Sequence, residues 1–387
     1  MGLKHKKRIL ITIDWFLPGY KAGGPIQSCA NLIAHLKDEF AFYVMTRNTD
    51  YTSEEPYPGI PANTWYHLEE GVQVYYFSAD TLSYTSLKEV IRNLPFDVIY
   101  INGIFSKYFS LFPLLIARRY LHVPVVVAAR GMFAPGAVNV KPGKKKAFFY
   151  VAKRLKLYAH TIFHATNEAE RVHIQRVLGK QVKVAVAANL PKALEEQEAS
   201  SAILKKSGCV KLVSVARISP EKNTRYALEI LKRFTYEGEI IFDIYGPVND
   251  TIYWKECQAI IQLLPENINV SYKGSLPSGM VSETLMQYHA LFLPTRGENF
   301  GHVILESLTA GLPVILSDQT PWRGLKAAQV GWDIPLQDEN KFREVVAHCV
   351  QMENEEYQHM RHRTQLYLKE KVITAEIIQQ NRQLFSV

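Results

Sequence analysis

The chain has 387 residues, of which 47% are hydrophobic and 21% are charged. This length suits two domains of about 150–200 residues each, and the composition excludes a largely disordered chain. The net charge of +8 favours anionic partners such as nucleotides or acidic lipids, while no nucleic-acid recognition module is found in the sequence.

Short apolar, β-branched runs alternate with amphipathic stretches through the first half of the chain. The runs predict strands at residues 8–13, 40–46, 72–77, 97–101, 124–129, 161–165 and 182–187. Helical periodicity fits residues 26–37, 106–120 and 168–178. Continuously apolar strands such as VVVAA at 125–129 are typical of a parallel sheet that helices cover on both faces.

A polar segment at residues 188–208 interrupts this alternation and predicts an interdomain linker, because it combines Asn-Leu-Pro with the run EEQEASSAILKKSG. Beyond it, strands are predicted at 211–216, 239–245, 268–273, 291–294 and 314–317, and helices at 224–234, 252–264, 281–289 and 303–310. The residues from Asn354 onward are polar and helical, and we expect them to pack across both domains.

Two consecutive βα series predict an α/β chain with two doubly wound, Rossmann-like domains. We assign residues 1–190 to an N-terminal domain, 191–208 to the linker, 209–355 to a C-terminal nucleotide-sugar-binding domain and 356–387 to helices that cross back toward the first domain. Ligands of such sheets bind outside the carboxyl ends of the strands, so we expect the two domains to face each other across a ligand-binding cleft.

Several patterns that would indicate other chemistries are missing from the sequence. The N-terminal residues do not resemble a signal peptide, and no apolar run reaches about 18–20 residues, so we expect a cytoplasmic protein that is soluble or peripheral at the inner face of the membrane. The four cysteines lie far apart without CxxC spacing, which predicts reduced thiols. Neither a P-loop nor the GxGxxG dinucleotide fingerprint occurs.

The most informative segment is residues 291–321, LFLPTRGENFGHVILESLTAGLPVILSDQTP, which predicts strand, turn, helix, turn and strand. Glu298 in the turn and Glu306 on the helix are too far apart to share a proton, but they could hold two ends of an extended ligand. Asn299, Phe300 and Gly301 offer backbone N–H groups at the helix start, where anionic or oxygen-rich ligands are favoured. The alternative is that both glutamates are solvated surface residues.

A second segment, SVARISPEKN at residues 214–223, places Arg217 and Lys222 on either side of a turn that opens a helix. Two cations at such a turn can converge on a diphosphate and match the charge that develops on a phosphoryl leaving group. Ordinary surface charge on a loop is the alternative.

These two segments resemble the glutamate-x7-glutamate element and the arginine-x4-lysine clamp of the retaining, hexosyltransferase-like glycosyltransferases of family 4 (group 1), which have the GT-B fold. The resemblance covers nearly the whole chain, is most specific in residues 210–321 and is weakest in residues 1–80. It implies that Glu298 and the following N–H groups lie at the donor sugar and phosphate, that Glu306 binds the donor ribose, and that Arg217 and Lys222 hold the diphosphate.

The same resemblance implies a UDP- or GDP-linked sugar as the donor substrate, with no cofactor and no metal ion. The sequence agrees in having no DxD motif, which binds metal in the other large transferase fold. It further implies that glycine turns of both domains approach the donor phosphates or the nucleobase, although each could be an ordinary structural turn. The residues that receive a role in this way are Gly23, Gly24, Lys21, Gly246, Lys273 and Gly274.

One position departs from the family pattern. Many relatives carry a histidine near the reacting centre where this chain has Arg130, in VVVAARGMF. Arg130 could bind an acidic acceptor or a phosphate, or form a structural ion pair. No catalytic base is named from the sequence. The resemblance implies a front-face displacement that needs none, because the leaving phosphate helps to take the acceptor proton.

Residues 141–157, KPGKKKAFFYVAKRLKL, predict a basic helix with aromatic and aliphatic side chains. Such a helix can lie at the interface of an anionic membrane, where a lipid-linked acceptor would be reached. Alternatively its apolar face packs on the sheet while the lysines are solvated.

The leading hypothesis is therefore a retaining glycosyltransferase that moves a sugar onto a glycan or lipid-linked acceptor in cell-surface polysaccharide synthesis. Two other functions stay open: a sugar-nucleotide epimerase or hydrolase of the same fold, and a catalytically silent nucleotide-sugar-binding protein.

Overall fold

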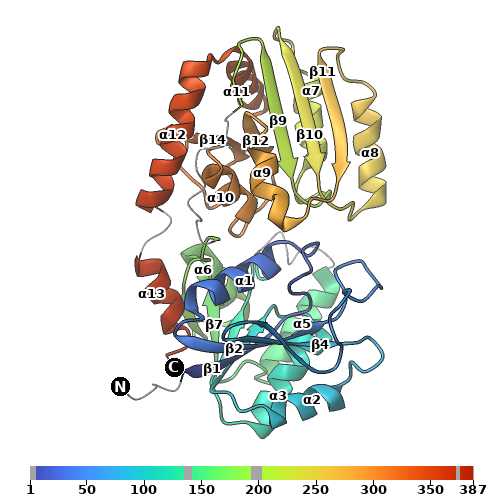
Figure 1. Cartoon of the computed structure of the whole chain (residues 1–387), viewed down its shortest axis with the longest axis vertical. Coiled ribbons are helices and arrows are strands. Elements are labelled where there is room, and N and C mark those ends of the chain that lie inside the picture. Colours follow the sequence, from blue (N-terminus) through green and yellow to red (C-terminus); the bar gives the residue numbers. More distant parts are fainter. Residues whose placement is uncertain (1–5, 135–141, 193–202, 372–374, 387) are drawn as a thin grey trace. The chain divides into compact units, whose positions relative to one another are not determined.

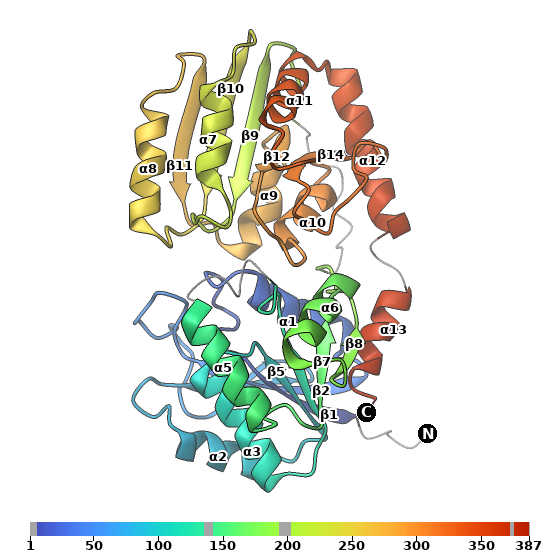
Figure 2. The ribbon, with the colours of Figure 1, turned by 180° about the vertical axis from the view of Figure 1, so that it is seen from behind.

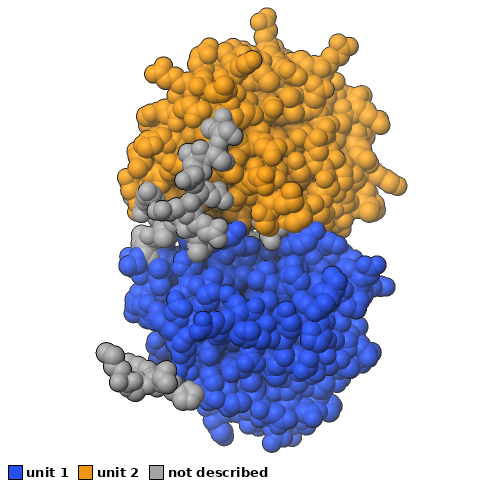
Figure 3. All heavy atoms as spheres, in the orientation of Figure 1, with its two compact units in different colours: residues 1–193, 375–387 blue, residues 194–374 orange. Residues whose placement is uncertain are grey.

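The computed structural model describes residues 6–134, 142–192, 203–371 and 375–386. The chain divides into two compact units (Figure 3). Unit 1 comprises Met1–Ala193 together with Ala375–Val387, and unit 2 comprises Leu194–Thr374. The predicted boundary between the N-terminal domain and its linker, at residues 190–208, falls partly on residues outside the described part.

Unit 1 is built on an eight-stranded sheet of order β3-β4-β2-β1-β5-β6-β7-β8, in which only β3 runs antiparallel to its neighbour (Figure 1). Its strands are β1 (Lys7–Thr12), β2 (Phe40–Arg47), β3 (Trp65–Glu69), β4 (Val72–Phe77), β5 (Val98–Asn102), β6 (Val125–Ala128), β7 (Thr161–Ala165) and β8 (Lys183–Val186). The central strands β5 and β6 are buried along their whole length, as expected of a sheet that is covered on both faces.

Helices cover both faces of this sheet and bury two separate apolar cores. One face packs against α1 (Gly24–Leu36) and α13 (Ala375–Gln383), the latter supplied by the C-terminal end of the chain. The other packs against α2 (Tyr84–Asn93), α3 (Phe112–Tyr120), α5 (Pro142–Arg154) and α6 (Glu168–Leu178). A π-helical turn at Lys107–Leu111 leads into α3.

Unit 2 contains a fully parallel six-stranded sheet of order β11-β10-β9-β12-β13-β14. Its strands are β9 (Cys209–Val215), β10 (Glu239–Tyr245), β11 (Ile268–Gly274), β12 (Ala290–Leu293), β13 (Val314–Ser317) and β14 (Gly331–Ile334). The strand order reverses between β9 and β12, so the loops that follow these two strands flank the topological switch point. Ligands of doubly wound sheets bind at such a point.

The helices of unit 2 again form two layers (Figure 2). One apolar core holds α7 (Thr224–Lys232), α8 (Thr251–Ile261) and α11 (Glu339–Gln351), and the other holds α9 (Val281–Leu285) and α10 (His302–Thr309). A 3-10 turn at Ser278–Met280 precedes α9. The long helix α12 (Asn354–Lys371) contributes to both cores. Among the described helices, none has the length and apolarity needed to traverse a bilayer.

The predicted α/β architecture with two parallel sheets is confirmed. The strands and helices at the carboxyl edge of unit 2 that carry candidate site residues were all predicted from the sequence. Four elements, β3, α2, β14 and α11, were not. Of the C-terminal helices that were expected to cross back toward the first domain, α12 belongs to unit 2 and α13 to unit 1.

Candidate active site

In unit 2 the loops after β9 and β12 are tied together by hydrogen bonds at the switch point. The buried Thr295, two residues after β12, donates its hydroxyl to the carbonyl of Glu221 at 3.0 Å. The N–H of Arg296 donates to the same carbonyl at 2.8 Å. On the other side of the loop, the amide of Asn223 donates to the carbonyl of Pro294 at 3.0 Å. These bonds fix the backbone on either side of Lys222.

The loop after β13 holds the same turn from the opposite side. The N–H of Glu298 donates to the carbonyl of Gln319 at 3.0 Å, and the buried hydroxyl of Ser317 donates to the carbonyl of Thr295. The turn that carries Glu298 is therefore fastened to both neighbouring loops. This rigidity suits a side chain that must hold a ligand in one orientation.

The structure brings two of the predicted residues, Lys222 and Glu298, into direct contact. They form a hydrogen-bonded ion pair although they lie 76 positions apart in the chain. Their side chains are only 14% and 13% exposed, so solvent screens this pair less than the surface ion pairs of the same unit. A largely desolvated ammonium at the switch point can bind a diphosphate, and the carboxylate beside it can accept hydrogen bonds from sugar hydroxyls.

The remaining predicted donor contacts lie in the loops after β9 and β12 and on α10. The guanidinium of Arg217 follows β9 and has no hydrogen bond or ion pair with any described residue. The N–H groups of Phe300 and Gly301 find no acceptor within the described part of the chain. Glu306 lies partly buried on α10, and Asn299 is partly buried in the turn. The indole of Trp322 donates to the carbonyl of Phe300 and so holds the end of this turn.

The backbone around Gly246, which follows β10, leaves no room for a side chain at this position. A Cβ at this position would lie 1.9 Å from the carbonyl oxygen of Ala216, so only glycine lets the loop after β10 pass the loop after β9. Its N–H donates to the carbonyl of Gly274 at 2.8 Å and is thus already bonded within the protein. Lys273 reaches Asp243 at 3.6 Å with a side chain that is 42% exposed. Gly246 therefore shapes the site through close packing, while its N–H is not available to phosphate.

In unit 1 the predicted glycine turn precedes α1 and is held by a buried carboxylate. The N–H groups of Tyr20 and Lys21 both donate to Asp50, at 3.1 and 3.3 Å. The N–H of Gly23 donates to the carbonyl of Tyr20 at 2.9 Å and is occupied within the turn. The N–H of Gly24 finds no acceptor among the described residues, so of the two predicted glycines only this one offers a donor.

Arg130 occupies the centre of a hydrogen-bonded network in unit 1. Its guanidinium donates to Asn102 at 2.7 Å, to Tyr100 at 3.0 Å and to the side chain of Asn189. None of these partners is a carboxylate, so the alternative of a structural ion pair is wrong in that form. The network ties the ends of β5 and β6 to the segment that leaves the unit, which gives Arg130 a structural role in the fold.

A further polar cluster in unit 1 was missed by the sequence analysis. Asp14 follows β1, Arg47 ends β2 and Ser106 follows β5, so three adjacent strands bring these side chains to one edge of the sheet. Ser106 donates to the Asp14 carboxylate at 2.8 Å, and Arg47 lies 3.5 Å from it. Burial raises the pKa of Asp14, although the hydrogen bond from Ser106 and the charge of Arg47 oppose the shift. The available signal was an aspartate directly after a buried strand.

Within the described residues, no group of three or more His, Cys, Asp or Glu side chains is arranged to hold a metal ion. The positive charge that the candidate site offers comes from Arg217 and Lys222.

Comparison with known proteins places this site in context. The family model described as glycosyl transferases group 1 matches residues 195–366, which include Arg217, Lys222, Glu298 and Glu306. None of the curated proteins is similar enough in sequence to match the chain.

Solved structures match the chain over nearly its whole length. A protein of Anabaena, HepE, in complex with UDP and glucose has a TM-score of 0.69 at 14% identity and covers 98% of this chain and 99% of its own. A trehalose-6-phosphate synthase, OtsA, has a TM-score of 0.71 at 10% identity, with 98% of each chain covered. WaaG, a glycosyltransferase of lipopolysaccharide biosynthesis, has a TM-score of 0.63 at 13% identity, also with 98% of each covered. The chain has the GT-B fold.

Proposed function

We propose that this chain is a retaining glycosyltransferase of the family 4 kind, which moves a sugar from a nucleotide diphosphate donor to a glycan or lipid-linked acceptor in polysaccharide synthesis. The observation that carries the proposal is the partly desolvated pair of Lys222 and Glu298 at the switch point of the sheet. This pair lies in the region that matches the group 1 glycosyl transferases.

In the proposed reaction the bond between the anomeric carbon and the diphosphate oxygen breaks, and its electron pair stays on the phosphate. Lys222 and Arg217 neutralise that developing charge in a site of restricted solvent access, where cations act most strongly. The acceptor oxygen bonds to the same face of the anomeric carbon, and its proton passes to the departing diphosphate. Glu298 and Glu306 hold hydroxyl groups of the sugar and the ribose. Because two cations supply the charge, we propose a metal-independent reaction.

For the acceptor we propose the carboxyl edge of the sheet in unit 1. Asp14, Arg47 and Ser106 can donate and accept hydrogen bonds to hydroxyl groups, and the Trp15 ring, 5.9 Å from the Arg47 guanidinium, adds an apolar face. We assign Gly24 and Lys21, which lie near this edge, to the donor phosphates or the acceptor.

A donor panel tests the proposal directly. The purified chain is incubated with UDP- and GDP-sugars, with and without cell-derived lipid and oligosaccharide acceptors, and products are identified by mass spectrometry and by the anomeric coupling in NMR. UDP-glucose is tried first, because a similar structure was solved with it. We expect transfer with retained configuration that persists in EDTA.

Two results of this panel would contradict the proposal. Rapid formation of an epimer or of free sugar without acceptor would support an epimerase or hydrolase. A donor that binds in calorimetry but is never turned over with any acceptor would support a silent binding protein.

We also propose that α5 lets unit 1 dock on an anionic membrane. Helix α5 buries Phe149 in the core, whereas Tyr150 and Val151 of the helix and Leu155, just after it, are 71%, 51% and 64% exposed. Three exposed cations, Lys153, Arg154 and Lys156, lie among the exposed apolar groups. Exposed aromatic and aliphatic groups beside cations suit the interface of an acidic bilayer. Lys141, the first residue of the predicted basic segment, lies outside the described residues.

Vesicle flotation tests this docking. We expect the chain to float with phosphatidylglycerol vesicles but not with phosphatidylcholine vesicles, and the double variant Tyr150→Ser, Leu155→Ser to lose most of the bound fraction. Leu263→Ser, which changes an equally exposed leucine of unit 2, is the matched control and should leave binding intact. Equal binding of the double variant and the unmodified chain would refute the assignment to α5.

A further inference from the structure

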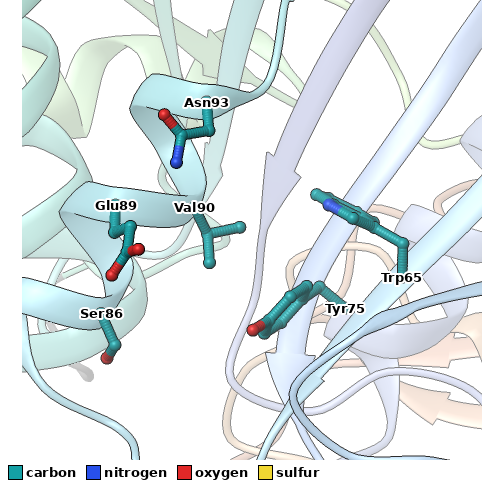
Figure 4. A pocket seen from close by; sticks show the side chains of 6 residues that line it. All are labelled: Trp65, Tyr75, Ser86, Glu89, Val90 and Asn93. Atoms are coloured by element: carbon teal, nitrogen blue, oxygen red, sulfur yellow. The ribbon is translucent and has the colours of Figure 1, made fainter.

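A cavity of about 300 Å³ lies at the edge of unit 1, among residues that the chemistry in unit 2 does not use. Figure 4 shows two aromatic rings on strands facing four side chains of one helix. The cavity is lined by Trp65 of β3, by Tyr75 of β4, and by Ser86, Glu89, Val90 and Asn93 of α2. The spacing of the helix residues, at i, i+3, i+4 and i+7, places them along one face of α2.

The two rings are held in place by the sheet. Trp65 and Tyr75 are register partners on antiparallel strands, and their rings meet edge to face with centroids 5.4 Å apart. Tyr43 supports Trp65 from β2 in the same manner, at 5.5 Å. Neither Trp65 nor Tyr75 is fully buried. The rings therefore form a rigid and partly exposed apolar wall.

Helix α2 leaves this wall uncovered. Its Leu87 and Ile91 are fully buried in the core, whereas Val90 points toward the rings and is only partly buried. Glu89 and Asn93 stand exposed at the rim. The apolar anchors of the helix thus lie to one side of the cavity, which keeps the rings open to a ligand.

The polar groups of the cavity have no partners within the described part of the protein. Neither the Glu89 carboxylate nor the Asn93 amide makes a hydrogen bond or ion pair there, and the indole N–H of Trp65 and the hydroxyl of Tyr75 are likewise unpaired. Burial raises the pKa of the Tyr75 hydroxyl, and the charge of Glu89 raises it further, so this group remains a hydrogen-bond donor near neutral pH. Ser86 differs, because its hydroxyl accepts from the N–H of Ser83 in the N-terminal cap of α2 and donates to the carbonyl of Thr81.

We propose that this cavity binds a neutral pyranose unit of the acceptor glycan, at a distance along the glycan from the reacting hydroxyl. One face of a pyranose ring carries C–H groups that pack on an aromatic wall, while its equatorial hydroxyls pair with a carboxylate and an amide at the rim. The cavity thus combines two partly exposed aromatic rings with polar groups that can orient a ligand through hydrogen bonds. The inference rests on the proposed function for the identity of the ligand as an acceptor, but the binding itself does not depend on it.

Saturation-transfer NMR with the full-length protein tests the site without any nucleotide sugar. The probes are the methyl pyranosides of glucose, galactose, mannose and N-acetylglucosamine and their β-linked disaccharides. We expect at least one of them to receive saturation. The double variant Glu89→Gln, Asn93→Ala should weaken its binding at least tenfold, while Glu54→Gln, an exposed carboxylate elsewhere in unit 1, should not change it.

A second variant tests the aromatic wall itself and is chosen so that the fold is retained even if the rings contribute to stability. Trp65→Phe retains the packing against Tyr43 but reduces the ring face and removes the indole donor, so we expect unchanged thermal unfolding and weaker saturation. Absence of binding for every pyranoside would overturn the inference, as would binding that is insensitive to both variants. Binding of tetramethylammonium in place of the sugars would also overturn it, because the site would then serve cations.

This experiment separates the two proposals. Pyranoside binding in a chain that turns over no sugar nucleotide would refute the transferase function alone. Sugar transfer by a chain that binds no pyranoside at this cavity would refute the pyranose site alone. If both hold, the rim variants should raise the KM for a long glycan acceptor more than the KM for a short one.

Discussion

Replacement of Lys222 by alanine is expected to lower the rate of sugar transfer about 10²–10³-fold, which is the loss seen when one preorganised group that stabilises transition-state charge is removed. The Lys222 side chain is 14% exposed and its ammonium is paired with Glu298, so the cation is largely desolvated and positioned before a diphosphate arrives. Because the charge on the leaving group develops only as the bond breaks, the loss should fall on kcat rather than on KM. Steady-state kinetics with the donor identified by the panel measure it.

The matched control for this variant is Lys341→Ala. Lys341 also forms an ion pair in unit 2, with Glu344, but the two side chains are 44% and 54% exposed and lie on the surface helix α11. We expect this variant to retain the full rate, because exposed ion pairs contribute little to the fold and Lys341 has no part in the site. Equal activities of Lys222→Ala and Lys341→Ala would show that the assigned catalytic role is wrong.

A double-mutant cycle separates catalysis from structure. Loss of Lys222 alone leaves the Glu298 carboxylate partly buried without its counter-ion, which by itself destabilises the fold. In the double variant Lys222→Met, Glu298→Gln both charges are gone, so stability should recover while the transfer rate stays low. If the rate recovers together with stability in thermal unfolding, the pair is structural and the mechanism proposed here fails.

The parallel core of both units was predicted well from the sequence, because the buried strands have a strong apolar pattern. Strands such as β6 and β12 consist of uninterrupted apolar residues, and burial on both faces leaves few other interpretations. The elements that were missed lack this signal. β3 is a partly exposed edge strand with the sequence WYHLE, and α2 buries only Leu87 and Ile91. The placement of β3 depends on its pairing with β4, which no local pattern contains.

The candidate site was predictable to a similar degree. The motifs predicted Arg217, Lys222 and Glu298 in loops that follow parallel strands, and the structure has them in such loops at one edge of the sheet, whereas their roles stay predictions. The ion pair between Lys222 and Glu298 was not foreseen, because it depends on hydrogen bonds between loops far apart in the sequence. The bonded N–H groups of Gly23 and Gly246 were missed for the same reason: a glycine in a turn can expose its donor or use it internally.

Acidification from pH 6.5 toward pH 3 is expected to destabilise unit 1 through His164. The ring is 2% exposed on β7 and is bonded at both nitrogens. A carbonyl can only accept, so Nε2 carries the proton that binds the Ala187 oxygen at 2.8 Å. Nδ1 therefore accepts from the hydroxyl of Tyr100, also at 2.8 Å, and that hydroxyl in turn accepts from Arg130. This arrangement requires a neutral imidazole.

Burial, and after it the charge of Arg130, lowers the pKa of His164 from 6.5 to about 3. In the unfolded chain the ring takes up a proton near pH 6.5, whereas the folded chain resists it down to about pH 3. Between these values the unfolded state binds more protons, so the free energy of unfolding falls by up to about 1.4 kcal/mol per pH unit as the pH decreases. The full contribution of His164 to the free energy of unfolding is present only above pH 6.5.

Urea unfolding of the unmodified chain and of His164→Gln at pH 7.5, 6.5, 5.5 and 4.5 measures this contribution, with hydrogen exchange of peptides from β7 reporting on unit 1. Glutamine can still donate to Ala187 but does not titrate. Below pH 6.5 the free energy of unfolding of this variant should therefore depend less steeply on pH, by the uptake of nearly one proton, even if the variant is less stable at pH 7.5. His67→Gln, an exposed histidine of β3, should leave the slope unchanged. Parallel curves for His164→Gln and the unmodified chain would mean that the buried ring accepts a proton after all. The bonding of the Arg130, Tyr100 and His164 network described here would then be incorrect.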